Sequence, residues 1–134
     1  MIVVDTNVIH YCWVRGRNTE IAQAVRQKDA EWHAPILWRS ELRNVLTAYL
    51  RRGLLTREQI VAILSVADQA LAECEHILPD DLVLDVVASS TLTAYDAEFV
   101  ALATALSVPL VTADKEVLKA FPDRAVTMET FISA

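Results

Sequence analysis

Candidate strands alternate with longer amphipathic segments along almost the whole of this 134-residue chain, and this alternation constrains the fold more than any other feature. The first candidate strand is the Ile-Val-Val run at 2–4, and others lie at 31–34, 75–78, 109–112 and 125–126. Short apolar strands separated by helices form parallel sheets that helices cover on both faces. The sequence therefore predicts one α/β domain over residues 1–134, with a small central parallel sheet of about five strands.

Helices are expected between these strands because apolar residues recur there at three- and four-residue spacing. The expected helices cover 6–14, 19–28, 35–52, 56–71, a segment from 80, 95–107 and a short segment from 114. Gly16 and Gly53 each follow a helical pattern, which predicts a positive φ just past a helix end. Thr56 and Gln59 have the spacing of a capping box at the start of the 56–71 helix.

Charge is unevenly distributed along this acidic chain, whose net charge is −6. Residues 1–57 carry nine basic and five acidic side chains, whereas residues 58–134 carry three and thirteen. An acidic protein repels nucleic acid, unless bound cations reverse the sign of an acidic pocket. The arginines of the first part either form a local basic surface or belong to ordinary solvated helix faces: Arg15, Arg17, Arg26, Arg39, Arg43, Arg51, Arg52 and Arg57.

Several classes of protein are disfavoured by composition. No apolar run reaches the ~18 residues of a membrane helix, and Met1 leads directly into a short strand without the features of a signal peptide. We therefore expect no membrane association and a cytoplasmic location. Cys12 and Cys74 are far apart and indicate buried thiols, and the three histidines lack the spacing of a zinc site.

Four acidic residues occupy positions from which they can meet. Asp5 directly follows the first candidate strand, and Asp114 follows the fourth by two residues. In open parallel sheets, sites lie beyond the carboxyl ends of the strands. Asp96 falls in the first turn of the 95–107 helix, and Glu41 lies at the margin of the apolar stripe of the 35–52 helix. A carboxylate that faces partly inward is unusual unless it is paired or binds a cation.

Each of these acids also has a purely structural interpretation. Asp5 and Asp114 precede helices and can be N-caps. Asp96 can complete a capping box with Thr93, and Glu41 can pair with Arg39 or Arg43. If the four do converge, two carboxylates ~4 Å apart repel by roughly 4 kcal/mol at an effective dielectric of ~20, which favours a bound counter-ion. Ligands that are all oxygen suit Mg²⁺ or Mn²⁺.

Four motifs in order along the chain resemble those of a PIN domain, and in particular the compact toxins of the VapBC toxin–antitoxin class. The motifs are 2–7 (IVVDTN), 40–46 (SELRNVL), 95–103 (YDAEFVALA) and 110–114 (LVTAD). The resemblance extends from Met1 to about Phe131. It implies a three-layer fold and a metal-dependent endoribonuclease that uses Mg²⁺ or Mn²⁺.

The resemblance also implies roles for single residues and for partners. The family's acidic quartet falls on Asp5, Glu41, Asp96 and Asp114, as catalytic residues and metal ligands, with polar support from Asn7, Thr112 and Thr6. It implies an RNA substrate, a homodimer and an antitoxin partner. Arg39 and Arg43 are our candidates for substrate binding. The sequence leaves open whether Glu98 or Glu116 joins the site.

Two other functions share these residues. A PIN-like module without catalysis would bind RNA or a partner protein, and a partner's basic side chain would then occupy the acidic pocket. Phosphotransfer through an aspartyl phosphate is disfavoured, because Asn7 stands where a second acid would be needed two positions after Asp5. Metal-dependent cleavage by the purified protein separates the first two functions.

Overall fold

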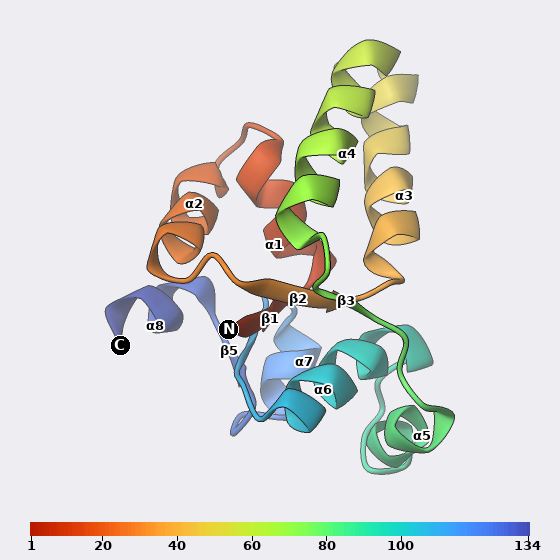
Figure 1. Cartoon of the computed structure of the whole chain (residues 1–134), viewed down its shortest axis with the longest axis vertical. Coiled ribbons are helices and arrows are strands. Elements are labelled where there is room, and N and C mark those ends of the chain that lie inside the picture. The colour runs from red at the N-terminus through yellow and green to blue at the C-terminus, as the bar shows by residue number, and fades with distance from the viewer.

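A parallel five-stranded sheet forms the centre of the molecule, which a computed structural model describes over all 134 residues (Figure 1). The strand order across the sheet is β3-β2-β1-β4-β5. The strands are β1 (Ile2–Val4), β2 (Trp32–Pro35), β3 (Glu75–His76), β4 (Leu110–Val111) and β5 (Ala125–Val126). The expected α/β class and the five parallel strands are confirmed.

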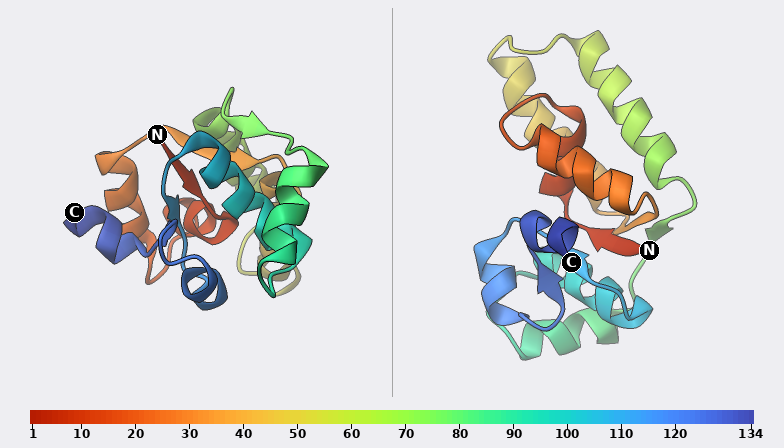
Figure 2. Two further views of the ribbon diagram at one scale, coloured as in Figure 1. Left: turned by 90° about the horizontal axis from the view of Figure 1, so that it is seen from below. Right: turned by 90° about the vertical axis from the view of Figure 1, so that its left-hand side faces the viewer.

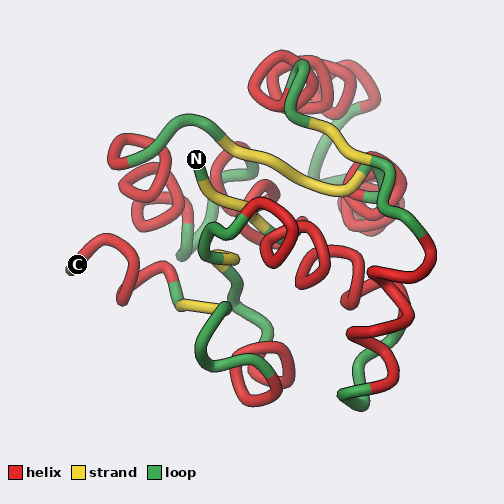
Figure 3. Tube along the Cα trace, turned by 60° about the horizontal axis from the view of Figure 1, so that its bottom comes forward, coloured by secondary structure: helices red, strands yellow, loops and turns green.

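Helices cover both faces of this sheet. They are α1 (Thr6–Trp13), α2 (Thr19–Lys28), α3 (Trp38–Arg51), α4 (Arg57–Leu71), α5 (Asp80–Ala88), α6 (Ala94–Leu106), α7 (Lys115–Ala120) and α8 (Met128–Ser133). Helices α1 to α4 lie on one face and α5 to α7 on the other, with α8 beside α2 (Figures 1 and 2). The strands run between these two helical layers in Figure 3. None of the eight helices has the length and apolar character needed to cross a bilayer.

The core is built from the strands and from the helices that pack directly on them. All three residues of β1 are buried, and the buried side chains of α6 include Phe99, Val100 and Leu102. On the other face, α3 buries Trp38, Leu42 and Leu46, which recur at four-residue spacing. Burial of these side chains fixes the rotation of α3 about its axis, and that rotation decides which polar residues of α3 face the carboxyl edge of the sheet.

Helices α3 and α4 form an antiparallel hairpin that projects beyond the sheet (Figure 2). Gly53 has a φ of 69° after α3, as predicted, and Thr56 and Gln59 form the predicted capping box at the start of α4. Two predictions were wrong in detail. Gly16 does not have a positive φ, and α3 begins at Trp38 instead of residue 35, because Pro35 extends β2 and pairs with His76 of β3.

The chain order of the strands defines one special place on the carboxyl edge. From β1 the chain moves outward to β2 and β3, and then returns to β4 on the other side of β1. Binding sites of open parallel sheets lie at such a switch point, because the connections from the two strands diverge there and leave a crevice. Asp5 follows β1 and Asp114 follows β4, so both acids border this crevice.

Candidate functional site

A pocket of about 180 Å³ lies at the switch point between β1 and β4. All four acids of the predicted quartet line it, together with Thr6, Asn7 and Thr112. The acids come from four places in the fold: the end of β1, α3, the first turn of α6 and the start of α7. The remaining lining residues are Asn44, Val45, Phe99, Leu110 and Val117.

Asp5 uses its two carboxylate oxygens for different purposes. Oδ1 accepts a hydrogen bond from the Val8 backbone N–H (2.9 Å) and caps α1, whereas Oδ2 accepts from the Thr112 hydroxyl and from the Ala113 N–H (3.4 Å). The parallel register of β1 and β4 brings Thr112 to this position, because Val4 pairs with Val111 one step earlier. Asp5 is therefore both the N-cap of α1 and a carboxylate that lines the pocket.

Asp114 has the same double character at the end of β4. Its Oδ1 accepts from the backbone N–H groups of Glu116 (2.8 Å) and Val117 (3.3 Å), which caps α7. Its own N–H donates to the Thr112 hydroxyl oxygen (3.0 Å). Thr112, which is 1% exposed, thus links the two aspartates that border the crevice, donating to one and accepting from the other.

Glu41 is held in the pocket by α1. Its Oε1 accepts a hydrogen bond from the Thr6 hydroxyl at 2.7 Å, so the alternative ion pair with Arg39 or Arg43 is not formed. Asp96 lies in the first turn of α6, where its backbone N–H donates to the Thr93 hydroxyl at 3.1 Å. Its carboxylate lines the pocket and is half-buried.

The electrostatics of the pocket show that the acids influence one another. Burial raises the pKa of Asp5 to about 6, opposed by the hydrogen bonds from Thr112, Val8 and Ala113, and the charge of Asp114 adds to the rise. Burial, followed by the charge of Asp114, also raises the pKa of Asp96. Burial and the charge of Asp96 raise the pKa of Glu41, so metal-free ionisation of this cluster is unfavourable.

Glu98 and Glu116 lie at the margins of this cluster and do not line the pocket. The charge of Glu41 adds to the effect of burial in raising the pKa of Glu98, and the charge of Glu116 contributes to the raised pKa of Asp96. Both side chains therefore extend the negative field without facing the centre of the pocket.

The donor set fits a hard divalent cation. Its oxygen ligands are carboxylate, hydroxyl and amide oxygens, which Mg²⁺ and Mn²⁺ prefer, and burial, followed by neighbouring negative charge, raises the pKa of Asp5, Glu41 and Asp96. As they lie, no three acidic, histidine or cysteine side chains are grouped closely enough to ligate one ion. Mg²⁺ commonly binds through one or two carboxylates and keeps several waters, so such a grouping is not required.

The two arginines predicted to bind substrate are not at the pocket. Arg39 donates to Glu75 (2.6 and 2.7 Å) and to Asp68, which ties α3 to β3 and α4. Arg43 lies on the same side of α3, next to Leu64 of α4. Asn44 lines the pocket and was missed, although its position three residues after Glu41 on a helix was a usable signal.

Replacement of Thr112 by valine is expected to weaken divalent-cation binding by about 10- to 100-fold, the usual effect of losing a group that orients a metal ligand. Valine has the shape of threonine but neither donates to Asp5 nor accepts from Asp114. Calorimetric titration with Mn²⁺ measures the change. Thr47→Val, at a threonine that bonds only to the Arg43 carbonyl, is the matched control. Unchanged affinity in Thr112→Val would contradict the role of Thr112.

Stability of the metal-free protein is expected to fall as the pH rises from about 4 to 6. The pKa of Asp5 is about 6 in the folded protein against an ordinary value of 3.8, so the folded state binds the proton more tightly and loses this advantage above pH 6. A metal must displace this proton. Thermal denaturation should therefore show that Mn²⁺ raises the melting temperature more at pH 7.5 than at pH 5. An equal rise in melting temperature at the two pH values would contradict displacement of a proton from Asp5 by the metal.

Comparison with known proteins identifies the family. A family model described as PIN domain matches residues 2–123, so the chain belongs to the PIN domain family, whose members are typically nucleases. PAE2754 from Pyrobaculum aerophilum is 23% identical, with a TM-score of 0.70, over 98% of this chain and 93% of that chain. FitAcB from Neisseria gonorrhoeae is 17% identical, with a TM-score of 0.75, over 96% and 99%. These two crystal structures share the fold. No curated protein sequence matches the chain.

Proposed function

We propose that this PIN-domain protein is a metal-dependent endoribonuclease that hydrolyses RNA phosphodiester bonds. The observation that carries the proposal is the convergence of Asp5, Glu41, Asp96 and Asp114 on one pocket at the switch point of the sheet. Family membership supports the class of hydrolase. The oxygen-only donor set supports Mg²⁺ or Mn²⁺ as the cofactor.

Each side chain of the pocket has a role in this reaction. Asp5, Asp96 and Asp114 would hold the cation, with Glu41 binding directly or through water. When bound there, such a cation would supply an activated water for in-line attack and would stabilise negative charge on the phosphate and the leaving oxygen. Thr112 and Thr6 hold the carboxylates of Asp5 and Glu41 in fixed orientations. Asn7 and Asn44 offer exposed amides at the rim, where substrate oxygens can accept hydrogen bonds.

We also propose two protein partners. The chain would be the toxin of a toxin–antitoxin pair, and it would form a homodimer. An apolar groove of about 540 Å³ lies between α1 and the hairpin, lined by Trp13, Tyr49, Leu55 and Ile63 among others. Helix α4 also exposes Val61 and Val66. Exposed apolar surface rimmed by polar residues commonly marks a protein interface. A neighbouring reading frame for a short protein with a DNA-binding N-terminus would support the antitoxin assignment.

Incubation of the purified protein with single-stranded RNA tests the activity. We expect cleavage in Mg²⁺ or Mn²⁺, none in excess EDTA, and recovery when Mn²⁺ is restored. Cleavage that persists in EDTA would refute the metal role. Binding of RNA without cleavage under any of these conditions would favour the alternative of a non-catalytic module.

A further inference from the structure

The side of α3 that carries Glu41 continues from the pocket to two arginines. At 3.6 residues per turn, Ala48 and Arg52 each lie within about 20° of Glu41 around the helix axis, and Asn44 and Arg51 lie about 60° and 80° to one side. Apart from Glu41, which is half-buried, these residues are exposed. We call this surface the α3 strip; it comprises Glu41, Asn44, Ala48, Arg51 and Arg52 and is about 16 Å long, at a rise of ~1.5 Å per residue.

Arg51 and Arg52 differ from Arg39 in having no acidic partner. Arg39 is the one arginine of the chain that forms salt bridges, and both of its partners tie α3 to other elements. Arg43 is placed with Arg39, about 160° around the helix from Glu41. Arg39 and Arg43 therefore face away from the pocket, and Arg39 ties α3 to β3 and α4. Arg51 and Arg52 have no acidic partner and are free to bind an anion beside the strip.

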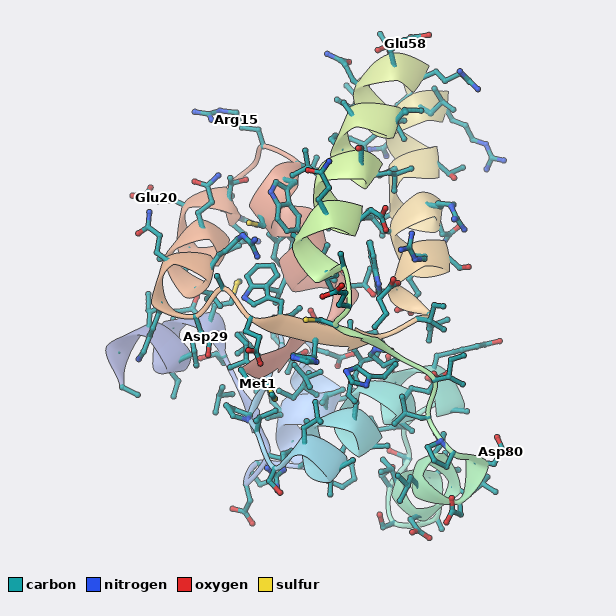
Figure 4. All side chains as sticks on the ribbon, in the orientation of Figure 1. Met1, Arg15, Glu20, Asp29, Glu58 and Asp80 are labelled. Atoms are coloured by element: carbon teal, nitrogen blue, oxygen red, sulfur yellow. The ribbon has the colours of Figure 1, made fainter.

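On the other side of the pocket, the surface of α5 and α6 is acidic. No lysine or arginine occurs between residues 58 and 114, and α5 and α6 together carry five acidic side chains. In Figure 4, Asp80 at the start of α5 lies at the opposite end of the molecule from Glu58, which is near the tip of the α3–α4 hairpin. A phosphate backbone that left the pocket over α5 and α6 would meet only like charge, whereas along α3 it meets unpaired guanidinium groups.

We propose that the α3 strip binds the phosphates of a single RNA strand next to the bond that is cleaved, which rests on the proposed ribonuclease function. Arg51 and Arg52 present forked donors that match phosphate oxygens. Asn44 lies along α3 between the pocket and the two arginines, where its side-chain N–H groups can donate to phosphate oxygens. Ala48 is small and exposed, so the strand can approach the helix closely at that point. The strip therefore extends the substrate site from the acidic pocket to the hairpin.

Salt dependence of RNA binding tests the strip. Full-length protein with Asp96→Asn, which slows cleavage by about 10²–10³, is titrated with a fluorescent single-stranded RNA at constant MgCl₂ over a range of KCl concentrations, and the Arg51 and Arg52 variants are made in this same background. Charge reversal at both Arg51 and Arg52 to Glu should weaken binding and lower the slope of log K against log salt by about 0.7 for each phosphate that is no longer neutralised, or about 1.4 in all. The neutral pair Arg51→Gln and Arg52→Gln serves if charge reversal impairs folding.

Two further variants make the test specific. Lys119→Glu changes an exposed residue in the last turn of α7 that forms no hydrogen bond or ion pair, and should leave the slope unchanged. Arg43→Glu makes the same change on the other side of α3 and should lower the slope less than Arg52→Glu does. If Arg43→Glu and Arg52→Glu lowered the slope equally, RNA binding would depend on net charge alone. That result would contradict RNA binding by the α3 strip.

The remaining outcomes separate this inference from the proposed function. If the unmodified protein cleaves RNA while the Arg51 and Arg52 variants keep its affinity and slope, the strip is wrong and the ribonuclease function stands. If those variants change the oligomeric state in light scattering and leave the slope unchanged, the arginines serve a protein interface and the strip is again wrong. If the unmodified protein neither binds nor cleaves RNA, both proposals fail.

Discussion

Asp96→Asn is expected to lower kcat/KM for RNA cleavage by about 10²–10³, the magnitude typical of removing one group that stabilises the transition state electrostatically. Asparagine keeps the size of aspartate but removes the negative charge that the pocket offers to a cation. The fold should be retained, because Asp96 contributes to the start of α6 through its backbone N–H, which asparagine also has. Steady-state kinetics with a defined RNA oligonucleotide measures the effect.

Stability distinguishes this loss from a folding defect. Burial, followed by the charge of Asp114, raises the pKa of Asp96, so removal of the Asp96 charge should leave the melting temperature of the metal-free protein unchanged or raise it. Asp85→Asn, at an exposed acid of α5, is the matched control and should keep full activity. Full activity in Asp96→Asn would remove this residue from the catalytic group.

Trp38→Ala is expected to lower the free energy of unfolding by about 3–5 kcal/mol, the usual cost of truncating a buried aromatic side chain. Trp38 is 1% exposed at the base of α3, and its indole N–H donates to Glu75 at 2.8 Å. Its ring also packs against the Arg39 guanidinium, whose carbon lies 5.2 Å from the ring centroid. Urea denaturation monitored by circular dichroism measures the change.

Trp38→Phe provides the comparison for this variant. Phenylalanine retains most of the buried ring but cannot donate to Glu75, so we expect a smaller loss in the free energy of unfolding. The difference in that free energy between the two variants measures the contribution of the buried ring. A loss for Trp38→Ala no larger than the ~0.5 kcal/mol of a typical surface substitution would contradict the packing of α3 on the sheet. Because α3 presents Glu41, the alanine variant should also weaken metal binding.

The parts of the fold set by local pattern could be predicted from the sequence. Short apolar runs and three- and four-residue spacing were enough for the parallel sheet and for the placement of Asp5 and Asp114 at its carboxyl edge. The predicted start of α3 was wrong because proline often begins a helix. Pro35 is instead the last residue of β2, where it pairs with His76 of β3. Tertiary contact decided that boundary, and local propensity did not.

The site shows the same division between local and distant information. The acids were identified by motif, but their double role as helix caps and pocket carboxylates depends on the register of β1 and β4, which places Thr112 between Asp5 and Asp114. The pairing of Arg39 with Glu75 joins residues 36 positions apart and carries no local signal. The sequence therefore predicted an arginine surface without distinguishing its structural members from its free ones.

Mn²⁺ binding tests the central claim most directly, namely that the acidic pocket is a divalent-cation site. Isothermal titration at pH 7.5, above the pKa of about 6 of Asp5, should show saturable binding to the unmodified protein. Asp5→Asn and Asp96→Asn should each lose this binding or weaken it severely, whereas Asp85→Asn should keep it. No saturable binding, or equal binding by all four proteins, would contradict a metal site at Asp5, Glu41, Asp96 and Asp114.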